Sequence, residues 1–258
     1  MLTELKMLLA DDNKLITALK YLNPRKPKNV TLFRVGNDCD GGYVMLSELI
    51  KKNGISYSFG IGGATSWEDQ ISKEFNNKIY MYDHTIGGIN SSDPNFIWKQ
   101  IGIGKSDWGH INTIKTIIKN NNHENETDMT LQCDIEGSEW DIFLDTPQET
   151  LCQFAQMNVE MHWLGSMLTD NSKHIDGYDR VLETLKTLRK NFTPFHIHGN
   201  NYRPTFSVDG KLCGDVIEVS YVRNDLVEFS DDDVIFPTSL DRPNKRNRPD
   251  IKLGNFKW

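Results

Sequence analysis

Long apolar runs are missing from this chain. No stretch approaches the roughly 20 consecutive apolar residues that a membrane-spanning helix needs. The opening residues, MLTELKMLLADDNK, hold an apolar patch that charges interrupt and that is too short for a signal-peptide core. We therefore expect no membrane span and a cytoplasmic location.

Cysteine is scarce, and its spacing argues against two common roles. No C-x-x-C pair occurs, so the spacing typical of a zinc site is missing. The four cysteines lie far apart, which predicts reduced, mostly buried thiols and no disulfide framework. They are Cys39, Cys133, Cys152 and Cys213.

Positive charge is also in deficit. The chain has 29 Lys and Arg against 36 Asp and Glu, a formal net charge of −7. Such a balance is poorly suited to neutralising phosphates, so we expect no nucleic-acid partner and favour a small-molecule substrate. Apolar residues at 38% and charged residues at 25% are typical of a globular protein. The 258 residues suffice for one large domain, and composition leaves oligomerisation open.

What the sequence does contain is a strand followed by a glycine turn and a helix, in residues 55–70, ISYSFGIGGATSWEDQ. Its first five residues alternate in the way of a buried strand. The segment Gly60-Ile61-Gly62-Gly63 then lets the backbone turn sharply or approach a ligand closely. Thr65 and Glu68 have capping-box spacing, and the apolar face of the helix is Trp67, Ile71 and Phe75.

Strand, glycine turn and helix is how a nucleotide-binding α/β domain begins. The glycines do not follow G-x-G-x-x-G, so a tight turn without a ligand stays an equal alternative. A second strand, KIYMYD, ends at Asp83, about twenty residues later. An acid there can accept hydrogen bonds from ribose hydroxyls, or it can cap the next turn.

Acids and histidines follow several further strands. In MTLQCDIEGSEWDIF, Asp134 and Glu136 stand two apart at a strand end, so they face one pocket, and Ser138 with Asp141 predicts the start of a helix. The next strand, 154–162, ends in Glu160 and His162. The segment FTPFHIHGNNY then contributes two histidines and two asparagines, His196, His198, Asn200 and Asn201.

Strands alternate with helices along most of the chain, which predicts an α/β fold with a mostly parallel, doubly wound sheet and an antiparallel edge strand at 215–223. Ile97–Gly104 reads as the third strand, and TLFRVGNDCDGGYVML, residues 31–46, as a hairpin or loop. We expect an N-terminal helical segment at 1–30, the α/β domain at 31–225, and a C-terminal tail at 226–258 that packs on or extends it. The ligand crevice should lie at the carboxyl ends of the strands.

The blocks RVGNDCDGGYV, YSFGIGGATSWED, IYMYDHT, LQCDIEGSEWDIF, NVEMHW and FHIHGNN together give a family resemblance. The chain resembles S-adenosylmethionine-dependent methyltransferases of the FkbM-like group, in the branch with D-G-G-Y and D-I-E-G-x-E-W motifs. The resemblance covers residues 34–223 and implies a Rossmann-like methyltransferase domain.

The resemblance also implies site residues. The loop glycines would cradle the methionine part of S-adenosylmethionine, Asp83 would bind the ribose, and Gly102 with its neighbours would flank the adenine. His84 is also expected to bind the cofactor. Ser58 stands where an acid is often found, which leaves Glu68 or Asp134 to hold the amino group. We expect the acceptor to contact Asp40, Tyr43, Glu136 and Asn200.

Methyl transfer to oxygen needs an aligned acceptor and a group that takes its proton. His162 and His198 are the candidate bases, beside Asp134, and Glu160 would orient one of them or hold a hydroxyl. A second version places a divalent cation on Asp134, Glu160 and one histidine. The resemblance favours a sugar hydroxyl as acceptor, on a nucleotide-activated sugar for capsule or surface glycan synthesis in a bacterium.

Three alternatives stay open at this point. A nicotinamide-dependent sugar dehydrogenase or epimerase shares the layout, but the later glycine and a Tyr-x-x-x-Lys pair are missing. A metal-dependent hydrolase would use Glu160-x-His162 and His196-x-His198. The third alternative is a non-catalytic member that binds a ligand.

Overall fold

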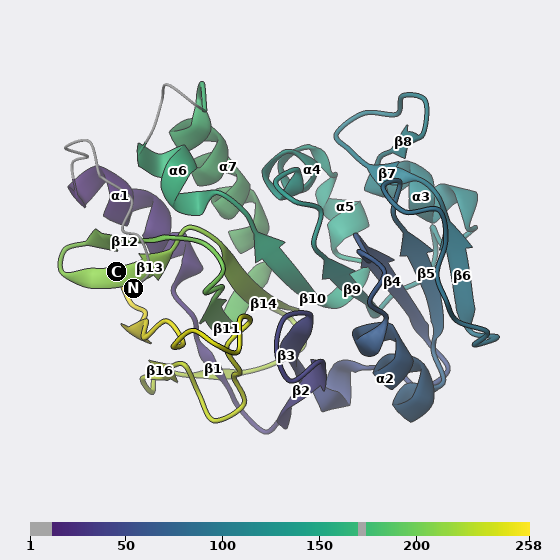
Figure 1. Cartoon of the computed structure of the whole chain (residues 1–258), viewed down its shortest axis with the longest axis horizontal. Coiled ribbons are helices and arrows are strands. Elements are labelled where there is room, and N and C mark those ends of the chain that lie inside the picture. The colour runs from purple at the N-terminus through teal and green to yellow at the C-terminus, as the bar shows by residue number, and fades with distance from the viewer. Residues whose placement is uncertain (1–11, 170–173) are drawn as a thin grey trace.

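A seven-stranded sheet forms the centre of the computed structural model, which describes residues 12–169 and 174–258 (Figure 1). The strand order across the sheet is β6-β5-β4-β9-β10-β14-β11. In chain order these strands are β4 Ile55–Phe59, β5 Lys78–Tyr82, β6 Phe96–Lys99, β9 Met129–Cys133, β10 Phe154–Met161, β11 Phe192–Gly199 and β14 Ile217–Arg223.

Helices and short ladders surround this sheet. The helices are α1 Asp12–Leu19, α2 Ser66–Phe75, α3 Ile114–Asn120, α4 Glu139–Asp145, α5 Gln148–Leu151, α6 Leu164–Thr169 and α7 Gly177–Arg189, with 3-10 turns η1 Lys20–Leu22 and η2 Ser47–Leu49. The two-stranded ladders pair β1 Lys26–Pro27 with β15 Phe229–Ser230, β2 Leu32–Gly36 with β3 Gly42–Leu46, β7 Gly102–Ile103 with β8 Ile111–Asn112, β12 Thr205–Val208 with β13 Lys211–Gly214, and β16 Ile235–Phe236 with β17 Gly254–Asn255.

The sheet is mostly parallel, as the sequence predicted. Strands β6, β5, β4, β9 and β10 run parallel, and β14 is antiparallel to both of its neighbours. The antiparallel strand lies one position inside the edge, because β11 is the outermost strand. The chain builds outward from β4 to β6 and then returns to β9, so the winding reverses between β4 and β9. A ligand crevice is expected at the carboxyl ends beside such a reversal.

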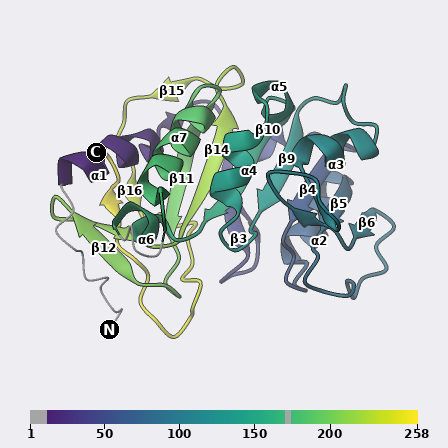
Figure 2. The same ribbon diagram turned by 90° about the horizontal axis from the view of Figure 1, so that it is seen from above.

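Alternation along the strands sends side chains to two different cores. On β5, Ile79 and Met81 pack with Trp67 and Ile71 of α2, while Tyr82 packs with α3 in the main core. Figures 1 and 2 show α3, α4 and α7 over one face of the sheet, and α2 with the β2–β3 hairpin on the other. The predicted hairpin in residues 31–46 is therefore confirmed.

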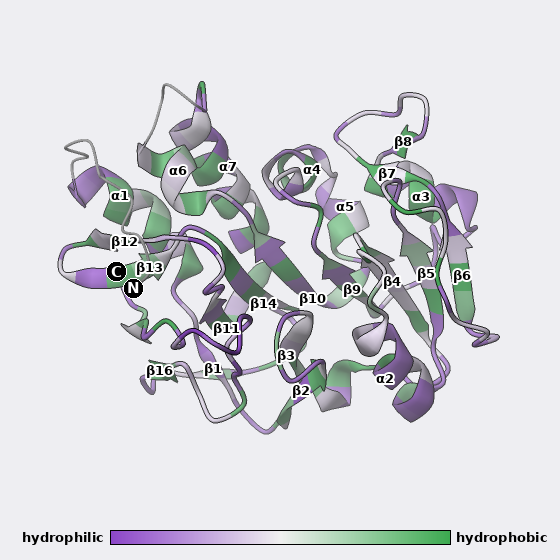
Figure 3. Cartoon of the chain, viewed as in Figure 1, coloured by the Kyte–Doolittle hydropathy of each residue, from purple (hydrophilic) through white to green (hydrophobic). Residues whose placement is uncertain are grey.

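Strands β10 and β14 carry polar residues that are buried (Figure 3). They bond the backbone of the hairpin strand β3: Asn158 and Ser220 each donate to the Val44 carbonyl, at 3.1 and 2.7 Å. Gln156 accepts from the Leu46 N–H at 3.0 Å and donates to the Leu46 carbonyl at 2.9 Å. Buried polar groups are stable only when bonded in this way, and here the bonds fix the hairpin on the sheet.

Four local predictions had different outcomes. Thr65 stands at the N-cap of α2 but does not form the predicted capping box, and its hydroxyl donates to Asp69 at 2.9 Å. The predicted helix start at Ser138 is confirmed, because α4 begins at Glu139, although the Ser138 side chain makes no capping bond. The strand expected at 97–104 is divided into β6 and β7. The helical spacing of Leu5, Leu8 and Leu9 lies outside the described residues.

The C-terminal segment, residues 231–258, returns across the ends of β11 and β14. Its Trp258 N–H donates to the Asn23 side chain at 2.9 Å, close to where α1 and η1 end.

Domain boundaries near residues 30 and 225 stay a prediction. Within residues 12–169 and 174–258, no helix is both long and apolar enough to cross a membrane.

Candidate active site

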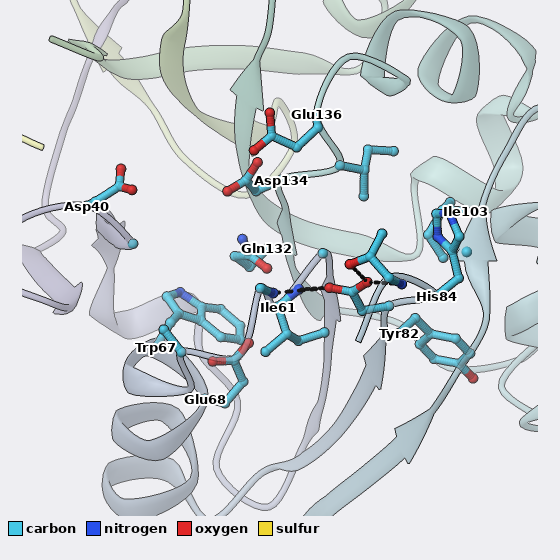
Figure 4. A pocket seen from close by; sticks show the side chains of 18 of the residues that line it. Asp40, Ile61, Trp67, Glu68, Tyr82, His84, Ile103, Gln132, Asp134 and Glu136 are labelled. Atoms are coloured by element: carbon cyan, nitrogen blue, oxygen red, sulfur yellow. Dashed lines mark hydrogen bonds between the residues drawn. The ribbon is translucent and has the colours of Figure 1, made fainter. Parts of the chain in front are cut away.

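Two adjoining cavities open at the carboxyl ends of the parallel strands. The first cavity, of about 400 Å³, is lined from the ends of β4, β5, β7 and β9 and from α2. The second cavity, of about 330 Å³, is lined from the ends of β10 and β11 and the loops beyond them. Asp40, Asp134 and Glu136 line both cavities, so their carboxylates form the border between them (Figure 4).

The glycine loop forms one wall of the first cavity. A Cβ on Gly60 would lie 1.6 Å from the Asp134 carbonyl oxygen, so only glycine allows β4 and β9 to approach here. Gly62, by contrast, has φ +57° and no heavy atom within 4 Å of a built Cβ, so its backbone faces open space. Gly63 lies outside the lining of the cavity.

Asp83 holds this loop in place. Its Oδ2 accepts from the N–H groups of Ile61 and Gly62 at 3.0 and 3.1 Å, and its Oδ1 accepts from the N–H and hydroxyl of Thr85 at 2.7 and 2.6 Å. Burial works against the ionised carboxylate, but these hydrogen bonds outweigh it and lower the pKa of Asp83. Four donors saturate the roughly four lone-pair sites of a carboxylate.

Glu68 brings a second acid to the first cavity, from α2. Its carboxylate makes a short hydrogen bond with the Ser58 hydroxyl, which also lies 2.8 Å from Gln132 Oε1. Burial raises the pKa of Glu68 to about 7. The Ser58 hydroxyl has one proton and can donate it to only one of these two oxygens. If Glu68 is protonated, it donates to Ser58 while Ser58 donates to Gln132, and both hydrogen bonds form.

Gly102 and His84 meet at the far wall of the first cavity (Figure 4). A Cβ on Gly102 would lie 2.5 Å from His84 Nδ1 and 2.5 Å from Ile111 Cδ1. The glycine therefore lets the loop after β5 and the β7–β8 ladder approach each other. Tyr43 lines this cavity from β3, and burial raises the pKa of its hydroxyl.

His162 is the centre of the second cavity. Its Nδ1 lies 3.1 Å from Glu139 Oε1 and 3.1 Å from the Glu160 carbonyl oxygen. Its Nε2 lies 3.4 Å from Glu136 Oε2, 3.8 Å from Asp134 Oδ1 and 3.8 Å from Glu160 Oε1. Burial disfavours the imidazolium, but the Glu139 hydrogen bond and the surrounding carboxylates raise the pKa of His162.

Acidic side chains crowd around this histidine. Burial raises the pKa of Asp134 to about 7, although the charge of His162 opposes the shift. Burial also raises the pKa of Glu160, and the nearby Asp134 and Glu218 carboxylates add to the effect. Asn200 donates to Glu160 Oε1 at 2.6 Å, so it contacts the cluster as well. Two groups of residues could hold a metal ion: Asp134, Glu160 and His162, or Asp40, Glu160 and Glu218.

His198 does not belong to this arrangement. It lies outside the lining of both cavities, with Nδ1 2.9 Å from Glu218 Oε2 and Nε2 2.9 Å from Asp250 Oδ1. Burial opposes the charge, but the two acids raise the pKa of His198 to about 10. A protonated imidazole that donates from both nitrogens has no free lone pair, so the geometry argues against His198 as a base.

Several residues of the site escaped the sequence reasoning. Glu139 accepts from the N–H groups of Ile135 and Gly137, both at 2.9 Å, and orients His162. It is the last acid of the D-I-E-G-x-E-W motif, which was the signal that could have marked it. Glu218 could have been suspected as a lone acid in an apolar strand. Other lining residues without a sequence signal are Trp67, Gln132, Tyr202 and Arg203.

A winding reversal in a mostly parallel sheet, with a glycine loop and two adjoining cavities at the carboxyl ends of the strands, is typical of a Rossmann-like α/β domain. Residues 13–207 match the family model described as a methyltransferase domain, which covers more than half of the chain. The chain therefore belongs to this methyltransferase family, and the protein is an S-adenosylmethionine-dependent methyltransferase. No curated protein matches the chain.

Proposed function

We propose that the protein transfers the methyl group of S-adenosylmethionine, bound in the first cavity, to a sugar hydroxyl bound in the second cavity. The observation that carries the proposal is the border between the two cavities, where Asp134 lines both. A methyl group needs such a junction, because sulfur, carbon and acceptor oxygen must align at near contact distance.

The donor residues follow from the walls of the first cavity. Ser58 occupies the strand position where related enzymes often have an acid, and its hydroxyl touches the Glu68 carboxylate. The carboxylate of Glu68, from the following helix α2, therefore lies beside this strand position. We assign Glu68 to bind the amino group of the donor. Asp83 would take the ribose hydroxyls by releasing one of its four present donors. Gly102 and His84 would flank the adenine.

The second cavity fits a neutral polyol best. Its walls carry carboxylate and amide groups that accept hydrogen bonds from hydroxyls, including those of Asp40, Glu160 and Asn200. A phosphate would be repelled by the acids, so the diphosphate of a nucleotide-activated sugar would lie towards Arg203, whose guanidinium stacks 4.5 Å from the Trp163 ring centroid. The FkbM-like motifs support a glycan acceptor, such as a capsule or surface sugar.

Asp134 suits the role of proton acceptor better than either histidine. Its pKa of about 7 lies near physiological pH, where a general base is most effective. His162 Nδ1 is engaged by Glu139 and by the Glu160 carbonyl oxygen, and His198 is bonded at both nitrogens. The acceptor would lose its proton to this cluster as its oxygen attacks the methyl carbon and the carbon–sulfur bond breaks.

Calorimetric titration with S-adenosylmethionine, its demethylated product and NAD tests the donor. Binding of the first two compounds but not of NAD supports the proposal, and binding of NAD alone would overturn it.

Asp134→Asn should abolish methyl transfer to screened sugars while the protein still unfolds cooperatively, and the exposed control Asp179→Asn should keep wild-type activity. Full activity in Asp134→Asn would exclude Asp134 from the chemistry.

A further inference from the structure

The Nε2 atom of His162 faces three carboxylates without a hydrogen bond to any of them. The oxygens of Glu136, Asp134 and Glu160 lie 3.4, 3.8 and 3.8 Å away, beyond the usual 2.7–3.2 Å of a hydrogen bond. Asp134 Oδ1 is shielded from solvent and has no hydrogen-bond partner among the described residues. An acceptor buried in this way is costly unless a ligand satisfies it.

These separations are slightly wider than those of atoms that share one metal ion. Nitrogen and oxygen ligands bonded at about 2.1 Å lie roughly 3.0–3.6 Å apart for bond angles between 90° and 120°. The ligand atoms of Asp134, Glu160 and His162 all lie within 4.8 Å of one another, so the three side chains would draw together around a bound ion.

The imidazole is also oriented as a metal ligand would be. Metal-bound histidines nearly always have their second nitrogen bonded to a carboxylate or a backbone carbonyl, which fixes the tautomer and the ring. His162 Nδ1 has both partners, the Glu139 carboxylate and the Glu160 carbonyl, each at 3.1 Å. Glu139 is itself held by two backbone N–H groups. Asn200 supports Glu160 from the other side.

The other acidic group is already satisfied by the protein. Glu218 pairs with His198 through one oxygen and with Asn244 through the other. Asn244 Nδ2 also donates to Asp40 Oδ1 at 2.9 Å. Both carboxylate oxygens of Glu218 thus have partners in the protein, whereas Oδ1 of Asp134 has none among the described residues.

We infer that Asp134, Glu160 and His162 bind one divalent cation, with Mn²⁺ as a suitable probe for a site of one imidazole and two carboxylates. The inference deepens the proposed function, because the ion would lie beside the border of the cavities and hold the acceptor hydroxyl. On transfer, the hydroxyl proton passes to the oxygen of Asp134 that does not bind the ion, and Glu136, whose side chain is 72% exposed, can pass it on to solvent. A lone pair of the acceptor oxygen forms the new O–C bond, and the electrons of the broken C–S bond stay on sulfur.

Mn²⁺ binding to chelator-treated protein tests the site without any methyl acceptor. We expect calorimetry to give one ion per chain, and pulsed electron paramagnetic resonance to show coupling to an imidazole nitrogen. His162→Gln should remove that nitrogen coupling, and Asp134→Asn should weaken Mn²⁺ binding at least about 100-fold, since changes even beyond the direct ligands cost 10- to 100-fold. Asp40→Asn, in the other acidic group, should change the affinity less than about threefold.

The outcomes separate this inference from the proposed function. Absence of Mn²⁺ binding, or a nitrogen coupling that survives in His162→Gln, overturns the metal site. Methyl transfer that persists in the chelated enzyme also overturns it, yet leaves the proposed function intact. Failure of S-adenosylmethionine to bind, with or without Mn²⁺, defeats the proposed function and is measured on the same samples. Thermal unfolding of each variant shows whether it has folded.

Discussion

Glu68 is a buried carboxyl group in the wall of the first cavity, and under the proposed function its protonation would oppose donor binding. Its pKa of about 7 lies above the ordinary value of 4.5, so the folded protein binds more protons than the unfolded chain between these pH values. The free energy of unfolding therefore falls as pH rises through this window. The donor has the opposite preference, because its ammonium group pairs with the ionised form.

We accordingly predict that the affinity for S-adenosylmethionine rises between pH 5.5 and about 7.5 in the wild-type protein. In Glu68→Gln the affinity should be nearly constant over this range and about tenfold weaker at pH 7.5, in keeping with loss of one charge-assisted hydrogen bond. Calorimetry in buffers of different ionisation enthalpy measures both the affinity and the released proton. Equal pH dependence in the two proteins would remove Glu68 from the donor site.

Asp83 bonds the glycine loop, and the proposed function also assigns it to the ribose of the donor. Asp83→Asn loses the charge and half of the acceptor capacity, so we expect S-adenosylmethionine to bind about 10- to 100-fold more weakly. Asp93→Asn is a matched control. Like Asp83, Asp93 accepts a hydrogen bond from the backbone N–H two residues later, here that of Asn95 at 2.9 Å, but it does not line the first cavity. Similar losses in both variants would indicate a general effect on folding.

The β2–β3 hairpin depends on β10 for its position. Replacing Gln156 by Met leaves the N–H and carbonyl of Leu46 unpaired in the interior, which should cost about 2–4 kcal/mol. Because the hairpin carries Asp40 and Tyr43, we expect the acceptor KM to rise as well. Amide hydrogen exchange at Leu46 should accelerate.

A control comes from Gln153, which directly precedes β10. Gln153 donates to the carbonyls of His123, Glu124 and Glu126, so Gln153→Met should also destabilise the protein. It should leave the acceptor KM unchanged, because that loop is remote from both cavities. If Gln153→Met raised the KM as much as Gln156→Met, the hairpin would not be the cause.

The elements that the sequence predicted are those with local patterns. Alternating residues identified β4 and β9, and the period-two spacing of Asp134 and Glu136 placed both acids at one border. Thr65 and Ser138 stand at the N-cap positions of α2 and α4, but neither side chain makes a capping bond, and Thr65 bonds Asp69 instead. Spacing identifies a candidate cap, whereas competition among nearby acceptors decides which one bonds.

At the scale of the whole molecule, contacts between distant segments decided what the sequence could not. His198 was predicted to be a base from its place in H-I-H-G-N-N. Its partner Asp250 lies 52 residues further along, in a segment without periodicity. A long-range ion pair leaves no local pattern, and it changes the chemistry of the histidine completely. Glu160 and His162 were predictable because their strand end alone brings them to the site.

The triad of His198, Glu218 and Asp250 ties β11, β14 and the C-terminal segment together, and its strength should depend on pH. The folded-state pKa of His198, about 10, exceeds the ordinary value of 6.5. Its contribution to stability is therefore complete below about pH 6.5 and is lost as pH rises through 10.

Asp250→Asn keeps the shape but removes one charge, so the pKa of His198 should fall and the protein should lose about 1–3 kcal/mol at pH 7. Denaturant unfolding at pH 6, 8 and 10 should show a smaller decline in the variant than in the wild type, with S-adenosylmethionine affinity at pH 7 unaltered. Parallel stability curves for the two proteins would mean that the C-terminal segment is held by other contacts, such as the Asp241–His196 pair at 3.2 Å.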